Sequence, residues 1–339
     1  MSRKVFALML AFVAALAVVS IFTTQDKKER VTTAGAMGVG KEIDGKMERF
    51  TQYTTVGEVA TATAFNGMGR LLFPLDRPID VKVPLSEVGN HLLWYEGIKP
   101  ERTVAVMNYL HEQALDGKQV FYDIYTEEEK KADPTKGNTG LVFFYGKPGG
   151  RTAILNAGGG FVYVGAIHDS FPHAMELSKQ GYNAFALIYR PDARLACEDL
   201  ARAIAFIHEH ADELEIDVRE YSLWGGSAGA RMAAWLGSFG TEYFGEKSYP
   251  RPAAVIMQYT GLSEVYGNEP PTYNCVGTGD YIASYRVMES RIERIKANGT
   301  DAQIDVFQGL PHGFGLGEGT VAEGWLDHAV SFWEKQIAK

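Results

Sequence analysis

The stretch "LWGGSAGARMAAWL", residues 223–236, joins a strand-like run to a helix-like run through three glycines and one serine. Residues 225–229 fit the pattern G-x-S-x-G. A serine at such a turn adopts a strained backbone, and the residues two positions away must lack bulk, or strand and helix would collide. The pattern predicts that Ser227 is a nucleophile held above the end of a strand. A capping serine at a glycine-rich helix start is the alternative that this motif alone leaves open.

Two residues further along the chain suit the partners that a reactive serine needs. A serine hydroxyl becomes a good nucleophile only when a base removes its proton and an acid orients that base. Asp280 ends "VGTGD" after one predicted strand, and His312 lies in "GLPHGFG" after the last one. Ligands of α/β sheets bind outside such strand ends, so we predict a Ser227, Asp280, His312 triad. The remaining candidates lie inside predicted helices, beside the glycine loop or close to His312, and fit less well: His168, His173, His208, His210, His328, Asp301 and Asp305.

A glycine loop precedes the serine motif. "LNAGGGF", residues 155–161, follows a predicted strand and contains three consecutive glycines. Their backbone N–H groups are free to approach a ligand, because no side chain shields them. We predict that Gly159 and Gly160, with the N–H of Ala228, form an oxyanion hole for a tetrahedral intermediate. A flexible loop without this role is the alternative.

The pattern from residue 119 onward alternates apolar strands with amphipathic helices, which predicts a mostly parallel sheet covered by helices on both faces. The segment 127–140 is expected to be a turn or loop, and the last helix is expected to open at "TVAE", with Thr320 and Glu323 as a capping box. Strands are predicted at 119–125, 140–146, 152–156, 183–189, 221–224, 253–259, 272–277 and 304–307, and helices at 197–214, 228–236 and 285–299.

Together these motifs resemble the α/β-hydrolase serine esterases of the hormone-sensitive-lipase and acetyl-esterase (acetylxylan-esterase-like) group. Members carry H-G-G-G before the nucleophile, and here Ala157 stands in place of the histidine that braces the loop. The segment 312–314 matches the late H-G-F, and "YRPDA", residues 189–193, resembles a Y-R segment of the group. The resemblance covers about residues 119–338. It implies an α/β-hydrolase fold and carboxylic ester hydrolysis.

The start of the chain predicts export. Arg3 and Lys4 precede an uncharged apolar run, residues 5–21, so residues 1–25 are expected to be a cleaved signal peptide or an uncleaved membrane anchor. Membrane contact is expected through residues 5–21 only, and the location is expected to be extracytoplasmic. Residues 26–54 read as a flexible tether. The two cysteines, Cys197 and Cys275, are expected to be either buried thiols or a disulfide, and their spacing does not favour the disulfide.

Residues 55–118 lie outside the resemblance and are predicted to be a mainly helical extension before a catalytic domain over residues 119–339. The segment is too rich in large apolar residues for a solvated linker. A helix is predicted from Pro100. The extension is either a cap near the mouth of the site or a strut against the sheet. As a cap it would bring Trp94 to the substrate, and Phe161 beside the glycine loop is the second predicted substrate-binding residue.

The predicted function is hydrolysis of short-chain carboxylic esters through an acyl-enzyme, with acetyl groups on carbohydrate as a candidate substrate. The net charge of −9 argues against a nucleic-acid partner. No cofactor or metal is expected, because the sequence contains neither H-E-x-x-H nor a Cys/His cluster. Two alternatives remain: a serine peptidase of the prolyl-oligopeptidase kind, and a hydrolase fold used only for binding. Ala230, where such peptidases carry a second glycine, argues against the first.

Overall fold

A computed structural model describes residues 49–339, and within them one sheet of eight strands forms the centre. The strand order is β1-β2-β4-β3-β5-β6-β7-β8. The pairs β1–β2 and β2–β4 are antiparallel and the other neighbours are parallel, which confirms the predicted mostly parallel sheet. The strands are β1 (Phe121–Tyr122), β2 (Gly140–Phe144), β3 (Arg151–Asn156), β4 (Asn183–Ile188), β5 (Asp217–Gly226), β6 (Ala254–Gln258), β7 (Thr272–Gly277) and β8 (Ala302–Phe307).

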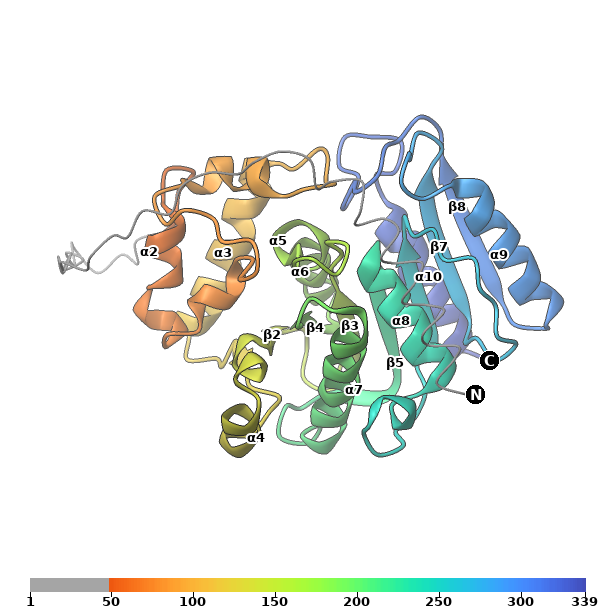
Figure 1. Ribbon diagram of the computed structural model, residues 1–339, viewed down its shortest axis with the longest axis horizontal. Helices are drawn as coiled ribbons and strands as arrows, with labels where there is room; N and C mark the ends of the chain where they lie inside the picture. The colour runs from red at the N-terminus through yellow and green to blue at the C-terminus, as the bar shows by residue number, and fades with distance from the viewer. Residues whose placement is uncertain (1–48) are drawn as a thin grey trace. The chain divides into compact units, whose positions relative to one another are not determined.

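Helices cover both faces of this sheet (Figure 1). The helices α6 (Phe171–Lys179) and α10 (Trp325–Ile337) share one face, where the rings of His173 and Trp325 lie 5.5 Å apart. The other face carries α7 (Ala193–Glu209), α8 (Ala228–Phe239) and α9 (Tyr285–Ala297). Because both faces are covered, the central strands β4, β6 and β7 are buried along their whole length. The predicted fold class, an α/β sheet with helices on both faces, is confirmed.

The extension before the sheet is mainly helical, as predicted. It consists of α2 (Val56–Ala60), three 3₁₀ turns, η2 (Thr63–Phe65), η3 (Gly69–Leu72) and η4 (Leu85–His91), and α3 (Pro100–Leu115), which starts at the predicted proline. Phe50, near the end of the predicted tether, is tied to α3 by two hydrogen bonds with the Asn108 amide. The predicted signal or anchor, residues 1–25, lies outside the described residues.

Most of the extension packs against the antiparallel edge of the sheet. The Phe65 ring meets the ring of Phe121 in β1 at 5.6 Å. The Arg70 guanidinium donates to the Gly137 carbonyl at 2.6 Å. Leu71 and Leu72 are each only 1% exposed. This part of the extension therefore acts as a strut. Its last segment, residues 92–96, lies beside the site.

Two local predictions are wrong. The segment 127–140, predicted as a loop, contains α4 (Glu127–Ala132) and the 3₁₀ turn η5 (Pro134–Asn138). The reason is a capping box, in which the Thr126 hydroxyl accepts from the Glu129 N–H and the Glu129 carboxylate accepts from the Thr126 N–H. A capping box had been predicted only at Thr320 and Glu323.

The last helix begins at Trp325 and not at "TVAE". The Thr320 hydroxyl donates to the Gly317 carbonyl and accepts from the Ala322 N–H, so it stabilises a turn and caps no helix. The Glu323 carboxylate accepts from the Gly319 N–H. Other boundaries also differ from the prediction: β1 is two residues long, α7 runs from 193 to 209, and β5 runs from 217 to 226.

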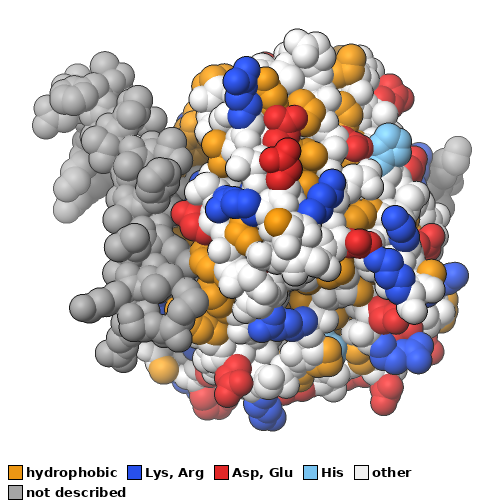
Figure 2. Space-filling view, turned by 90° about the vertical axis from the view of Figure 1, so that its right-hand side faces the viewer, with side chains coloured by type: hydrophobic (Ala, Val, Ile, Leu, Met, Phe, Trp, Pro, Cys, Tyr) orange, Lys and Arg blue, Asp and Glu red, His pale blue; other side chains and the backbone are white. Residues whose placement is uncertain are grey.

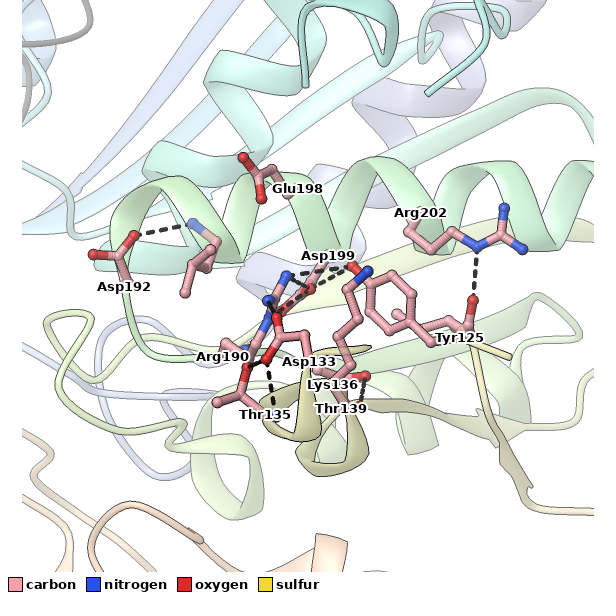
Figure 3. Close-up of polar contacts among 12 residues, drawn as sticks. Tyr125, Asp133, Thr135, Lys136, Thr139, Arg190, Asp192, Glu198, Asp199 and Arg202 are labelled. Carbon is pink, nitrogen blue, oxygen red and sulfur yellow. Dashed lines mark hydrogen bonds and ion pairs between the residues drawn. The ribbon is translucent and has the colours of Figure 1, made fainter. Parts of the chain in front are cut away.

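A buried polar network fixes α4 and η5 to the sheet (Figure 3). Arg190, which directly follows the "NAFALIY" strand, donates to the Asp199 carboxylate at 2.6 Å and to Asp133 at 2.8 Å. The Tyr125 hydroxyl also donates to Asp199 at 2.6 Å. The Asp199 side chain is fully buried, and these donors, together with the Arg190 backbone N–H at 2.8 Å, compensate its charge. The "YRPDA" segment thus has a structural role in this fold.

The outer edge at β8 and α9 presents a mixed surface. On the face that Figure 2 shows, acidic and basic side chains are interspersed with apolar and uncharged ones.

Cys197 and Cys275 are both buried and both free thiols. No helix among the described residues is long and apolar enough to cross a membrane.

Candidate active site

Ser227 stands at the turn between β5 and α8, as the motif predicts. Its backbone has φ 50° and ψ −113°, a left-handed conformation that is strained for a residue with a side chain. A side chain at Gly225 would collide with the backbone of Gly229, and one at Gly229 would collide with the Asn156 carbonyl. The two glycines therefore allow β3, β5 and α8 to meet closely enough to hold this turn.

His312 and Asp280 lie in hydrogen-bond reach of Ser227 in a single chain. The distance from Ser227 Oγ to His312 Nε2 is 3.1 Å, and that from His312 Nδ1 to Asp280 Oδ2 is 2.7 Å. The other Asp280 oxygen accepts from the N–H groups of Ile282 and Ala283 at 2.8 and 2.7 Å. The side chains of His312 and Asp280 are 3% and 0% exposed, so their geometry is shielded from water. This arrangement can take a proton from the serine hydroxyl.

The glycine loop passes directly beside the serine. A methyl group at Gly158 would lie 2.8 Å from the Ser227 Cβ. Gly159 and Gly160 have φ of 122° and 64°, which glycine adopts at least cost. Among the described residues their N–H groups donate to no acceptor, while Ala228 supplies the first N–H of α8. The structure thus brings the three predicted oxyanion residues to the surroundings of the serine.

The two predicted substrate-binding residues flank this loop differently. The Phe161 ring is 7% exposed and stacks on Trp235 of α8, with the ring centroids 6.2 Å apart. Trp94 is half-buried and lies over the loop, because a methyl group at Gly160 would come within 2.9 Å of its ring. The Phe161 side chain is therefore mostly engaged with the helix, whereas Trp94 covers the loop.

The last segment of the extension, residues 92–96, contacts the loops on both sides of the serine. Tyr163 follows the glycine loop, and its hydroxyl donates to the Leu93 carbonyl at 2.6 Å. The Glu96 N–H donates to the carbonyl of Gly313, next to His312, at 3.3 Å. The extension consequently combines a strut, which packs on the sheet edge, with a short segment that borders the site.

A buried carboxylate that the sequence did not predict, Asp169, lies beneath the site. Asp169 ends the short helix α5 (Ala166–Asp169) and is 3% exposed. It accepts hydrogen bonds from the Gly158 N–H at 2.5 Å, from the Tyr95 hydroxyl at 3.0 Å and from the Tyr259 hydroxyl. Burial raises the pKa of this carboxyl to about 6. The available signal was a single carboxylate in the stretch "GAIHDSFPHAM", residues 165–175, which is otherwise free of Asp, Glu, Lys and Arg.

The neighbouring histidines are structural. His168 Nε2 lies 2.9 Å from the Gly313 carbonyl and holds the loop that carries His312. Burial lowers the pKa of His168 to about 4 and that of His173 to about 3, so both rings are neutral near pH 7. No group of three or more potential metal ligands occurs in the described part of the chain.

Solved structures share the fold of this chain. Esterase 2 of Thermogutta terrifontis with bound propionate has a TM-score of 0.52 and 22% identity, over 58% of this chain and 89% of that chain. MGS-M1, an α/β-hydrolase from a Medee basin deep-sea metagenome library, has a TM-score of 0.53 and 19% identity, over 59% and 93% of the two chains. The chain has the α/β-hydrolase fold. At this level of identity the likeness establishes the fold alone.

A family model and a relative match parts of the sequence. The BD-FAE family model matches residues 150–267 of the chain, a range that includes the glycine loop and Ser227. Endo-1,4-beta-xylanase B of Butyrivibrio fibrisolvens is 28% identical over 158 residues, which cover 42% of this chain and 25% of the relative. The chain thus spans about a quarter of that relative's length. The predicted resemblance to α/β-hydrolase esterases is confirmed.

Proposed function

We propose that this α/β-hydrolase cleaves short-chain carboxylic esters through an acyl-enzyme on Ser227. The observation that carries the proposal is the continuous hydrogen-bonded chain from Ser227 Oγ through His312 to Asp280. His312 is the general base, and Asp280 holds its ring so that Nε2 faces the serine. The family match and the esterases among the fold neighbours support ester hydrolysis as the reaction class.

The reaction has two halves. Ser227 Oγ attacks the ester carbonyl carbon while its proton passes to His312 Nε2, and the carbonyl oxygen gains the negative charge. The N–H groups of Gly159, Gly160 and Ala228 stabilise that oxyanion. Collapse of the intermediate releases the alcohol, which takes the proton from His312. A water molecule then repeats the sequence on the acyl-enzyme and releases the carboxylic acid and free Ser227.

Acetyl groups on carbohydrate are the proposed natural substrate. The relative from Butyrivibrio fibrisolvens is named as a xylanase, and the T. terrifontis esterase holds propionate, a short acyl group. Trp94 beside the glycine loop offers an aromatic wall that suits either a short acyl chain or a sugar ring. A purely binding role is disfavoured, because the strained Ser227 backbone and the buried His312–Asp280 pair would serve no purpose in it.

The test is hydrolysis of a p-nitrophenyl ester series, from acetate to longer acyl chains, by wild type and by Ser227→Ala. The variant should lose roughly three to six orders of magnitude in turnover. Ser238→Ala is the matched control, because Ser238 lies in the same helix and its hydroxyl has no partner among the described residues. Wild type without ester hydrolysis, or Ser227→Ala with wild-type turnover, would overturn the proposal.

A further inference from the structure

Asp169 connects three parts of the molecule that meet under the site. Its carboxylate accepts from the Gly158 N–H in the glycine loop, from the Tyr95 hydroxyl in the extension and from the Tyr259 hydroxyl just after β6. An ionised carboxylate only accepts hydrogen bonds, so a site with three converging donors suits the ionised form. No basic side chain forms an ion pair with it among the described residues, so these neutral donors hold the charge.

The same carboxylate also packs against the nucleophile turn. A side chain at Gly226, the residue before Ser227, would collide with both Asp169 oxygens. A methyl group at Gly158 would lie 2.9 Å from Asp169 Oδ2 and 2.8 Å from the Ser227 Cβ. Asp169 therefore lies within contact distance of Gly226, which precedes the serine, and of Gly158, which lies beside it.

The loop needs such a support. Glycine has the largest conformational freedom of any residue, so consecutive glycines do not by themselves hold two N–H groups in one direction. Ala157 has no polar side chain that could anchor the loop. Its carbonyls are anchored by the Tyr189 hydroxyl on Ala157 at 2.7 Å, the Gly165 N–H on Gly158 at 3.0 Å, and the N–H groups of Val162 and Tyr163 on Gly159 at 3.0 and 3.3 Å. Asp169 is the side chain that holds an N–H group of the loop, that of Gly158.

We propose that Asp169 is a positioning residue of this hydrolase, whose ionised carboxylate holds Gly158 and thereby aims the N–H groups of Gly159 and Gly160 at the oxyanion. The inference rests on the proposed function, since it concerns the same transition state. It also assigns a role to the extension, because Tyr95 completes the set of donors around Asp169.

The proposal makes activity depend on the charge of Asp169. The titratable groups around it are the neutral hydroxyls of Tyr95, Tyr259, Tyr163 and Tyr189, the buried thiol of Cys275, the neutral buried rings of His168 and His173, and the ring of His312. A proton on Asp169 adds a donor where three donors already converge, so at least one tyrosine hydroxyl must turn to accept or lose its hydrogen bond. The acid side of the pH–rate profile then includes the protonation of Asp169.

The experiment compares Asp169→Asn with wild type in kcat and KM for p-nitrophenyl acetate across the pH range, with rates normalised by active-site titration. Asn has the same shape, but its NH₂ group faces donors. We expect kcat to fall roughly 10- to 100-fold with KM changed less than about threefold, as for loss of oxyanion stabilisation. The acid limb of log(kcat/KM) should be less steep in the variant than in wild type, because the titration of Asp169 is absent.

Tyr95→Phe is the second variant, and two matched controls come from the network at Asp199. Tyr125→Phe removes a hydroxyl from another buried carboxylate, and Asp199→Asn neutralises that carboxylate away from the serine. Tyr95→Phe should lower kcat about 3- to 10-fold, because a weakened hydrogen bond to Asp169 loosens its hold on the loop. The two controls should lower thermal stability and keep the wild-type kcat and acid limb.

Three outcomes would overturn the inference. An active wild type with an Asp169→Asn variant that keeps the wild-type kcat and acid limb would leave no positioning role. If Asp169→Asn does not fold, Tyr95→Phe with wild-type kcat and limb decides the same way. A wild type that hydrolyses no ester would overturn the proposed function first, and this inference would fall with it.

Discussion

The ionised Asp169 carboxylate lowers the stability of the folded protein, because it is buried. Burial raises its pKa from the ordinary 3.8 to about 6 in the folded protein. Between these values the unfolded chain releases the proton and the folded protein retains it, so the contribution of Asp169 to stability is present below about pH 4 and is lost as the pH rises through about 6. The ionised form is thus kept for its hydrogen bonds to the loop, against an unfavourable burial of charge.

This shift predicts a difference between wild type and Asp169→Asn. From about pH 4 to about pH 7 the free energy of unfolding of wild type should fall by about 3 kcal/mol relative to the variant, because about two pKa units are involved. Denaturant unfolding of both proteins at several pH values measures it. The comparison cancels the contributions of His168 and His173, which both proteins share. Parallel stability curves for the two proteins would contradict the assignment.

At the scale of elements, the extension divides into a strut and a segment that borders the site. Leu72 is 1% exposed in the strut, whereas Trp94 lies over the glycine loop. We expect Trp94→Ala to change the ratio of rates on acetyl and longer esters about tenfold, because it removes a wall near the acyl group. Leu72→Ala should cost about 2–5 kcal/mol in stability and leave that ratio unchanged. An unchanged ratio in Trp94→Ala, measured beside this control, would remove Trp94 from the substrate pocket.

The elements also show what the sequence can predict and why it stops. Strand ends place Ser227, Asp280 and His312 at one edge of the sheet, so their order along the chain was enough to group them. Asp169 has no such pattern, because its donors lie 74, 11 and 90 positions away and meet it only in the folded molecule. The start of α10 was misplaced for a similar reason, since the Thr320 hydroxyl finds a nearer partner in Gly317.

At the scale of the whole molecule, we propose that the protein is exported, either released after cleavage or anchored by its N-terminal segment. The charged start at Arg3 and Lys4 and the apolar run over residues 5–21 support this. Cell fractionation with mass analysis of the N-terminus measures it. Cleavage should give a shortened chain outside the cytoplasm, and anchoring should give the full chain in the membrane fraction. Full-length protein recovered only from the cytoplasm would refute both forms.

The account as a whole depends on Ser227 carrying the acyl group. The most direct measurement is acid-quenched mass spectrometry of the full-length enzyme during turnover of p-nitrophenyl acetate, followed by peptide mapping. We predict one added acetyl group on the peptide that contains Ser227, formed at the rate of the first product burst and absent from Ser227→Ala. Steady hydrolysis with no acetyl group on that peptide, or with the group on another residue, would contradict the account.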